Sequence, residues 1–385
     1  MRITLLSDTH LGFGSGTERD QDAFLAFEEA IARGLGSDLI LLAGDVFDTR
    51  TPTPETFSRA MEILLKSRFR PTTIKISGIR KDLTNSVEGI PVIAIHGNHE
   101  RRVKGLINPV EALERGGFLA HLHANGVLLE RGGEKLAVQG MSAVPSQYAA
   151  EAFKEWSPRP VPGAFNILLF HQNLEGYMIS LHPLPPSSIP EGFDLSICGD
   201  IHDARQATLH GSPLLLPGST VATQINKDAC TPRAIWDIDT STREILRLPL
   251  KSQREIFYQD CATEEEAREF LQKTLSHPRP LKPIIKIRGQ VSPDHLREQF
   301  REQAILLFSG ELESPGVTIE EQRLSVQESG KALLEKNLRE QGLDPLVFEP
   351  LFELLVNKKQ DEALDLLRKQ PASKPASVSN NYPDH

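Results

Sequence analysis

The segment that decides the fold is LILLAGDVFD, residues 39–48, in which an apolar run ends at Gly44 and Asp45 follows at once. An uninterrupted apolar run is typical of a strand that is buried on both faces, as in the parallel sheet of an α/β protein. The same order recurs in four other segments, whose apolar runs lead to these polar side chains: Asp8 and His10, Asn98 and His99, His171, and Asp200 and His202. Because ligands gather at the carboxyl ends of strands in α/β sheets, we predict that these side chains converge on one site.

The elements around this segment predict an α/β fold. From Met1 to about Asp239, apolar runs alternate with helical patterns at residues 21–35 and 54–66, which indicates a central sheet buried on both faces. From Val127 onward short strands dominate, and we predict that they form a second, more antiparallel sheet. The segments assigned to this second sheet are 126–130, 135–140, 165–171, 194–199, 213–218, 233–239 and 244–250.

Further along the chain, the composition indicates four smaller parts after a first domain of residues 1–250. Residues 251–312 read as a small α+β unit, with a capping box at Thr263 and Glu266 and a second helix that begins at Ser292 and Pro293. A polar linker at 313–329 precedes two helices within 330–369. The Pro-, Ser- and Asn-rich tail at 370–385 is expected to be disordered.

The overall composition sets limits on the environment. No apolar run approaches the roughly 18 residues that a membrane span requires, and the N-terminal residues lack the pattern of a signal peptide. Three cysteines form no zinc-binding spacing, and their odd number fits a reducing compartment, so we expect a cytoplasmic, nucleoid-associated protein. The net charge of −9 argues against nucleic-acid binding through bulk charge, although a local basic groove is compatible with it.

The polar side chains at the strand ends have the chemistry of a divalent metal site. Asp, His and Asn suit borderline or hard ions such as manganese, and no cysteine is present there that would select zinc. The set of ligand candidates is too large for one ion with open positions, and it fits two ions about 3.5–4 Å apart that share a carboxylate. Each motif alone is typical of a cap, a turn or a core histidine, whereas five in succession favour phosphoester hydrolysis.

Five short motifs carry a family resemblance. SDTHLG, GDVFD, GNHE, FHQN and GDIH resemble the sequence blocks of the calcineurin-like metallophosphoesterases. Within that superfamily the chain is most similar to the SbcD-type nuclease of double-strand-break repair, called the meiotic-recombination-eleven family in eukaryotes and archaea. DTRTPTPETF, EGIPVIAIHGNHE and LLLPGSTVATQI add to this likeness, and KPIIKIRG resembles the family's capping domain. The likeness covers about residues 1–310 and implies a four-layer α/β/β/α sandwich with a small α+β cap and C-terminal helices.

The resemblance also implies the roles of individual residues. One ion would be held by Asp8, His10, Asp45 and His202. The second would be held by Asp45 as a bridge, Asn98, His171 and Asp200. His99 matches a catalytic histidine that is not a ligand and that orients the scissile phosphate or assists the leaving oxygen. The implied reaction is manganese-dependent hydrolysis of DNA phosphodiesters, as an exonuclease on duplex ends and an endonuclease on single strands.

Asp200 departs from the family, which has Gly-His-x-His where this chain has Gly199-Asp200-Ile201-His202. Asp is a legitimate oxygen ligand, but a third carboxylate lowers the net charge of a two-ion site from about +2 to about +1. Less positive charge weakens activation of the bound water and stabilisation of the transition state. Asp is also shorter than His. One alternative is therefore a weakened or inactive scaffold that binds DNA ends, and a second is a phosphoesterase for small phosphoesters.

Other side chains have two interpretations each. Arg101 and Arg102 either hold a DNA phosphate or lie in a solvated loop. The basic residues of the small unit either face DNA or are ordinary surface charge; they are Lys251, Arg254, Lys282, Lys286 and Arg288. A first apolar set either packs in the core or forms a homodimer: Phe57, Met61, Leu64, Leu65, Val110 and Leu113. A second apolar set either joins the two C-terminal helices or docks on an SMC-like coiled-coil ATPase: Leu351, Leu354, Leu355, Leu364 and Leu367.

Overall fold

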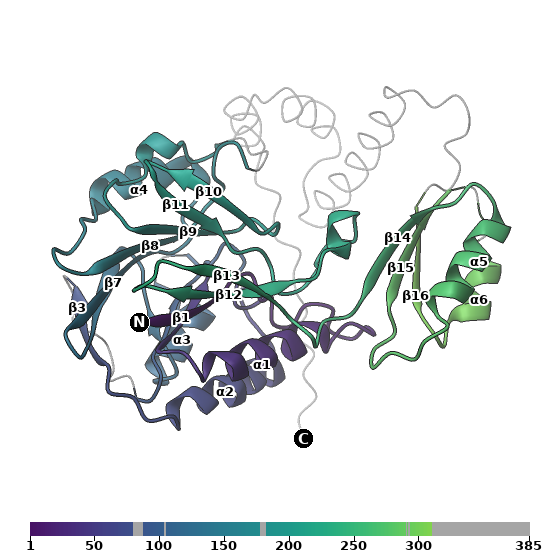
Figure 1. The fold of residues 1–385 in the computed structure, drawn as a ribbon, viewed down its shortest axis with the longest axis horizontal. Helices are drawn as coiled ribbons and strands as arrows, with labels where there is room; N and C mark the ends of the chain where they lie inside the picture. The colour runs from purple at the N-terminus through teal and green to yellow at the C-terminus, as the bar shows by residue number, and fades with distance from the viewer. Residues whose placement is uncertain (80–87, 104, 178–181, 290, 292, 310–385) are drawn as a thin grey trace, which may run out of the picture. The chain divides into compact units, whose positions relative to one another are not determined.

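A computed structural model of the chain describes residues 1–309 except 80–87, 104, 178–181, 290 and 292 (Figure 1). The predicted linker (313–329), helical region (330–369) and tail (370–385) lie outside the described residues, as does the helix cap at Ser292. The five C-terminal leucines assigned to partner docking lie outside them as well: Leu351, Leu354, Leu355, Leu364 and Leu367. Within the described part of the chain, none of the helices has the length and apolar character needed to cross a membrane.

The first sheet is built around residues 39–48 and contains six strands in the order β13-β12-β1-β2-β4-β5. β1, β2, β4 and β5 run parallel, whereas β12 and β13 add an antiparallel edge. The segment that decides the fold is therefore a central parallel strand. The bounds are β1 (Arg2–Leu6), β2 (Leu39–Ala43), β4 (Val92–Ile95), β5 (Ala120–His121), β12 (Ala234–Asp239) and β13 (Ile245–Pro249).

The second sheet contains seven strands in the order β10-β11-β9-β8-β7-β6-β3. Its central strands β7, β8, β9 and β11 are parallel, and antiparallel pairs add β10 at one side and β6 and β3 at the other. The sheet is thus mixed. The bounds are β3 (Lys75–Ile79), β6 (Asn125–Arg131), β7 (Glu134–Met141), β8 (Phe165–His171), β9 (Leu195–Gly199), β10 (Arg205–Leu209) and β11 (Ser212–Leu216).

The assignment of residues 233–239 and 244–250 to the second sheet is wrong, because they form β12 and β13 of the first sheet. β12 pairs with β1 so that Trp236 lies opposite Leu5, and both side chains belong to the core between the sheets. Alternating hydrophobicity identifies the face of a strand that is buried, but it does not identify the sheet that the strand joins.

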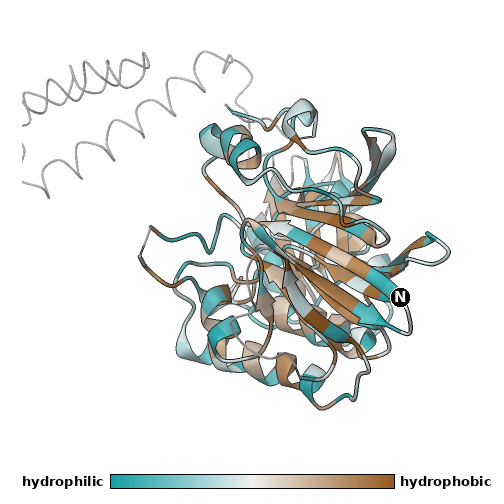
Figure 2. Cartoon of the chain, turned by 90° about the vertical axis from the view of Figure 1, so that its left-hand side faces the viewer, coloured by the Kyte–Doolittle hydropathy of each residue, from teal (hydrophilic) through white to brown (hydrophobic). Residues whose placement is uncertain are grey.

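The first sheet is apolar on both faces because it borders two cores. Leu6 and Leu42 pack against the helices, whereas Leu5 and Leu41 pack against the second sheet. Successive residues of a strand point to opposite faces, so a continuous apolar run is needed to fill both cores. A third cluster joins the outer face of the second sheet to α4. The predicted α/β/β/α order of layers is confirmed (Figures 1 and 2). The helices are α1 (Asp22–Gly34), α2 (Pro54–Arg68), α3 (Pro109–Arg115) and α4 (Ala149–Trp156).

Residues 256–309 form a separate parallel sheet in the order β14-β15-β16, with helices α5 and α6 packed on it. Thr263 caps α5 as predicted and accepts a hydrogen bond from Glu266 N at 3.2 Å, while the Glu266 carboxylate accepts from Ala262 N. The exact domain boundaries stay a prediction. The bounds are β14 (Ile256–Asp260), α5 (Glu264–Thr274), β15 (Ile284–Arg288), α6 (Pro293–Phe300) and β16 (Ile305–Ser309).

A buried ion pair joins this small unit to the core. Arg254 is only 8% exposed, and its Nε lies 3.0 and 3.1 Å from the two carboxylate oxygens of Asp22 at the start of α1. The same guanidinium donates to the carbonyl oxygens of Glu18 and Lys282. Arg254 is therefore neither a DNA-facing residue nor ordinary surface charge. Lys286 also turns toward the core, because its Nζ donates to Ile225 O at 2.7 Å.

We predict that Arg254→Ala lowers the free energy of unfolding by about 2–4 kcal/mol, because it leaves the buried Asp22 carboxylate with Arg19 as its remaining ion-pair partner. Urea denaturation measures the change. Arg301→Ala is the matched control, since Arg301 is exposed and pairs with its neighbour Glu302, and it should leave the midpoint unchanged. Equal effects of the two substitutions would contradict a structural role of the buried pair.

Candidate metal centre

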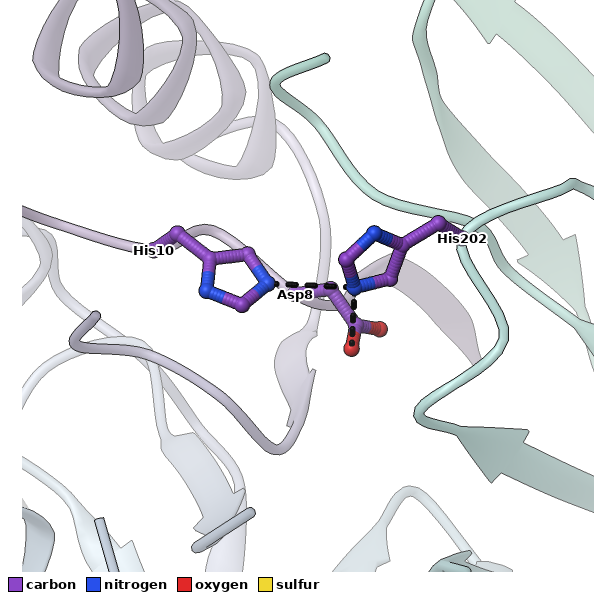
Figure 3. Close-up of side chains that lie close together, drawn as sticks. All are labelled: Asp8, His10 and His202. Carbon is purple, nitrogen blue, oxygen red and sulfur yellow. Dashed lines mark hydrogen bonds and ion pairs between the residues drawn. The ribbon is translucent and has the colours of Figure 1, made fainter. Parts of the chain in front are cut away.

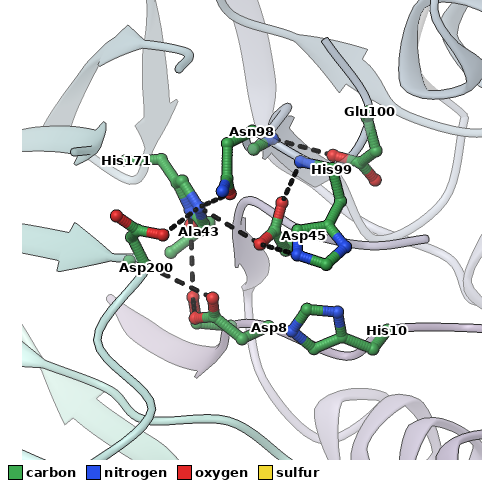
Figure 4. A network of polar contacts seen from close by, with 12 residues as sticks. Asp8, His10, Ala43, Asp45, Asn98, His99, Glu100, His171 and Asp200 are labelled. Carbon is green, nitrogen blue, oxygen red and sulfur yellow. Dashed lines mark hydrogen bonds and ion pairs between the residues drawn. The ribbon is translucent and has the colours of Figure 1, made fainter. Parts of the chain in front are cut away.

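The polar strand ends meet where the two sheets face each other (Figure 4). Asp8, Asp45 and Asn98 come after β1, β2 and β4 of the first sheet. His171 is the last residue of β8 in the second sheet, and Asp200 follows β9 directly. The structure therefore brings together the side chains that the sequence predicts to converge.

The backbone is strained at four of the predicted ligands. The φ angles are 50° at Asp8, 45° at His10, 45° at Asp45 and 81° at Asp200, in the left-handed region that residues with side chains seldom adopt. Such a conformation costs on the order of 1–3 kcal/mol per residue and persists only where the surroundings enforce it. Here Asp8 N donates to Gly44 O and His10 N donates to Asp45 O, each at 3.0 Å. Strain of this kind is concentrated at functional sites.

Glycines allow the strand ends to approach closely. A Cβ atom at Gly44 or Gly199 would collide with the His171 ring, and one at Gly97 would collide with the Asp45 carboxylate. The glycine in each of the motifs GDVFD, GNHE and GDIH is therefore required by packing around the site.

The first group of candidate ligands consists of Asp8, His10 and His202 (Figure 3). The Nε2 atoms of His10 and His202 lie 3.2 Å apart, and His202 Nε2 lies 3.7 Å from Asp8 Oδ1. On the outer side of the rings, His10 Nδ1 is 3.1 Å from Asp48 Oδ1 and His202 Nδ1 is 3.1 Å from Thr223 Oγ1. These outer contacts orient both rings so that their Nε2 atoms face the shared space.

The second group lies around His171. Its Nδ1 donates to Ala43 O at 2.8 Å, which leaves the lone pair of the neutral ring on Nε2. That Nε2 faces Asp45 Oδ2 at 3.4 Å, Asp200 Oδ1 at 3.7 Å and Asn98 Oδ1 at 3.3 Å. This nitrogen, which is free to bind a cation or a proton, is thus surrounded by atoms that accept hydrogen bonds.

The donor set at this position fits a divalent cation. The Asn98 oxygen faces acceptor atoms of Asp45 and His171, and the amide could donate to Asp45 Oδ2, at 2.9 Å, only if it were turned over. Carboxylate, amide and imidazole atoms that point at one another are the ligands that hard or borderline divalent ions prefer. A bound cation would satisfy all of them at once.

The ionisation of the group reflects this crowding. Burial opposes charge on Asp45, yet His171 and the other nearby histidines hold the pKa of Asp45 well below its usual value. Burial likewise opposes charge on His171, but Asp45 and the neighbouring carboxylates raise the pKa of His171 well above its usual value. A proton on His171 therefore supplies positive charge that a metal ion could supply instead.

Asp200 lies at the edge of this arrangement. Its Oδ1 reaches His171, and its backbone N donates to Asp8 Oδ1 at 3.2 Å, but the carboxylate belongs to none of the three compact groups of possible ligands. Burial raises the pKa of Asp200, partly offset by His171. The three groups are Asp8, His10 and His202; Asp8, Asp45 and His171; and His10, Asp48 and His99.

The third group contains Asp48, which the sequence analysis did not assign. Besides its bond to His10, Asp48 accepts at its backbone oxygen from His99 Nδ1 at 2.8 Å. Asp48 therefore orients both a predicted ligand and the predicted catalytic histidine. The His99 side chain is 39% exposed and lines a cavity of about 350 Å³ above the site, together with Tyr177 and Thr223. Asp48 is the second aspartate of the motif GDVFD, and this position in a recognised motif was the sign in the sequence that Asp48 belongs to the site.

Glu100 is a second residue that the sequence analysis missed. It is fully buried and accepts from Phe47 N at 2.7 Å and Gly97 N at 2.8 Å, so it joins the segments that follow β2 and β4. Burial raises the pKa of Glu100 to about 8, and the negative charge of the nearby Asp45 carboxylate adds to this effect. Glu100 is the last residue of the motif GNHE, and the sequence contains no other sign that Glu100 supports the site.

The remaining predicted residues lie away from the polar cluster. Arg101 is half-buried and Arg102 is exposed, with Nη1 directed to Ile107 O at 3.3 Å; their contact with DNA stays a prediction. Leu64, Val110 and Leu113 are fully buried in the core of the single chain, so the core interpretation holds for these three. Phe57, Met61 and Leu65 are half-buried, and the homodimer stays a prediction.

We predict that Glu100→Ala lowers the Tm by about 4–10 °C, because two buried backbone N–H groups lose their acceptor at a cost of about 1–3 kcal/mol each. Differential scanning calorimetry of the metal-free chain measures the shift. Glu191→Ala removes the same side chain at an exposed position and should leave the Tm unchanged. A Tm that is equally unaffected in Glu100→Ala would show that Glu100 does not hold the loops.

Comparison with known proteins places these residues in a family. The model of the calcineurin-like phosphoesterases, which use divalent metals, matches residues 1–204. The DNA double-strand break repair protein Mre11 of Methanopyrus kandleri is 30% identical over 236 residues, covering 57% of this chain and 48% of the relative. Double-strand break repair proteins of Caenorhabditis elegans (mre-11) and Homo sapiens (MRE11) are 27% and 26% identical, covering 66% and 67% of this chain and 41% and 42% of the relatives.

The resemblance to the meiotic-recombination-eleven family is thereby confirmed, although the chain spans about half or less of the length of these curated relatives. The matched region contains every strand end of the candidate metal centre, from Asp8 to His202. The family model matches more than half of the chain, and the fold and the metal-binding side chains agree with this match. The chain therefore belongs to the calcineurin-like phosphoesterase family.

Proposed function

We propose that the chain is a manganese-dependent, two-metal phosphodiesterase that cleaves DNA at ends and in single strands during double-strand-break repair. The observation that carries this proposal is that two compact groups of possible ligands, Asp8–His10–His202 and Asp8–Asp45–His171, adjoin each other at the buried Asp8. Two adjoining groups of buried ligands fit two neighbouring ions, and we assign the shared carboxylate to Asp45, which lies 3.4 Å from His171 Nε2.

Asp8, His10, Asp45 and His202 would hold one ion, and Asp45, Asn98, His171 and Asp200 would hold the other. When bound, such ions lower the pKa of a water molecule and clamp the oxygens of a phosphate. Asp48 and Thr223 orient the histidines of the first group, and Ala43 O fixes the tautomer of His171. The chain thus presents its ligands in fixed directions before any ion arrives.

His99 has the position of a group that acts on the substrate. Its Nδ1–H donates to Asp48 O, so its Nε2 is the atom left to face the cavity. The ring packs edge-on against His10, with 4.8 Å between centroids, which holds it beside the first group. When protonated, Nε2 can donate to a phosphate oxygen or to the leaving oxygen, in agreement with its predicted catalytic role.

The proposed partners rest on the names of the relatives and on the family resemblance of the sequence, and the proposed location rests on the composition of the chain. The relatives are repair proteins by name, and we propose that this chain likewise engages DNA ends and single strands. A homodimer, an SMC-like coiled-coil ATPase as partner and a cytoplasmic, nucleoid-associated location complete the proposal. The small unit anchored by Arg254 would contribute to holding DNA.

Asp200 supports one competing function. It stands outside the compact ligand groups, and burial favours its neutral form, so the second ion would be bound less firmly than with a longer histidine. The competing function is a DNA-end-binding scaffold with little or no hydrolysis. A phosphoesterase for small esters is the remaining alternative.

We predict that the full chain with MnCl2 cleaves both DNA ends and bis(p-nitrophenyl) phosphate, and that Asp200→His increases both rates by about tenfold or more, because a neutral ligand restores positive charge. Asp260→His, at an exposed position, is the control and should not change either rate. Activity only in Asp200→His would favour the scaffold, and cleavage of the small ester alone would refute the nuclease.

A second prediction concerns metal stoichiometry. Isothermal titration with MnCl2 should give two ions per chain, and Asp45→Asn should weaken both, because each ion loses the shared carboxylate. Asp260→Asn, which also removes one negative charge, should leave both affinities unchanged. Retention of two tight sites in Asp45→Asn would contradict the bridging role.

A further inference from the structure

A second cavity, of about 310 Å³, adjoins the cavity above the candidate metal centre. The two cavities have His202, Asp203 and Arg233 in common. The walls of the second cavity come from both sheets, through Arg205 of β10 and Arg247 of β13. The second cavity therefore lies next to the metal centre, on the side of His202.

The second cavity carries an excess of positive charge. Arg205, Arg233 and Arg247 line it, against the two carboxylates Asp203 and Asp228. None of these five side chains forms an ion pair within the part of the chain that the structure describes. We call this space the arginine cavity.

Most of the guanidinium hydrogen-bonding capacity in the arginine cavity is unused. Arg233 donates from Nη1 to His202 O at 2.9 Å, but its Nε is buried without a partner among the described residues. Arg247 donates to Pro232 O, and Arg205 makes no side-chain hydrogen bond with any described residue. Each guanidinium carries five N–H donors, so most of the donors in the arginine cavity have no protein acceptor among the described residues.

We propose that the arginine cavity binds a non-scissile phosphate of a nucleic-acid strand whose scissile phosphate lies at the metal centre. This inference rests on the proposed phosphodiesterase function and deepens it. The planar guanidinium matches phosphate oxygens in a bidentate manner, which makes arginine suited to this contact. A small phosphoester has one phosphate and cannot occupy both places, so the cavity favours a polymeric substrate.

The two carboxylates explain why a strand is the preferred source of the phosphate. Asp203 and Asp228 lower the net charge of the cavity, so a free anion would gain little by entering it. When one phosphate of a strand is already bound at the metal centre, its neighbouring phosphate is held close to the arginine cavity at a high effective concentration. The cavity can then bind this phosphate even if its affinity for a free anion is low.

Fluorescence anisotropy with the full chain in MnCl2 tests the inference. The probe is a labelled single strand with phosphorothioate linkages, which keep their charge and resist hydrolysis. Arg205→Gln and Arg247→Gln should each weaken binding by about threefold to tenfold and reduce the salt slope of log affinity by about 0.7. Arg243→Gln is the matched control, because Arg243 follows the far end of β12 and makes an exposed ion pair with Asp194; it should bind as the unsubstituted chain does.

The outcomes separate the inference from the proposed function. Arg205→Gln removes no hydrogen bond or ion pair with the described residues, so the Tm of this variant should match that of the unsubstituted chain, and the same Tm in Arg247→Gln would exclude misfolding as the cause of weaker binding. Unchanged affinity in both variants, an equal loss in Arg243→Gln, or no strand binding by the unsubstituted chain would each overturn the inference. Absence of phosphodiester cleavage by the unsubstituted chain would instead refute the proposed function, while the binding comparison would still decide the inference.

Discussion

Electron-rich atoms face one another across the junction of two sheets, and much of the fold serves to hold them in place. The Asp8 and Asp45 carboxylates are almost completely buried, in a setting where an uncompensated charge is costly. Left-handed backbone at both residues, glycines at the points of closest approach and the buried Glu100 all enforce the arrangement. A cation, or a proton on His171, is the complement that the arrangement requires.

Much of this arrangement could be predicted from the sequence because it follows from strand direction. Parallel strands end at the same edge, so Asp8, Asp45 and Asn98 were placed together by their position after apolar runs. The four layers follow from the apolar character of residues 39–43, which must fill two cores. The assignment of residues 233–239 and 244–250 failed because a strand's own pattern is the same in either sheet.

The residues that were missed act through contacts that a linear pattern does not contain. Asp48 and Glu100 stand inside recognised motifs, yet their roles depend on where His10, His99 and Gly97 lie in space. The sequence offers two interpretations of Arg254, contact with DNA or ordinary surface charge, and both are wrong because nothing near it in the sequence indicates its partner Asp22, more than two hundred residues earlier. Long-range polar contacts are thus the part of the structure that sequence patterns predict least well, and they set the geometry of the site and the attachment of the small unit.

The central claim is that Asp45 is shared by two ions, and anomalous diffraction at the manganese edge from crystals grown with MnCl2 tests it most directly. The account predicts two anomalous peaks, one among Asp8, His10 and His202 and one beside Asn98 and His171, both within coordination distance of Asp45. A single peak, or two peaks of which either lies beyond the reach of the Asp45 carboxylate, would contradict it.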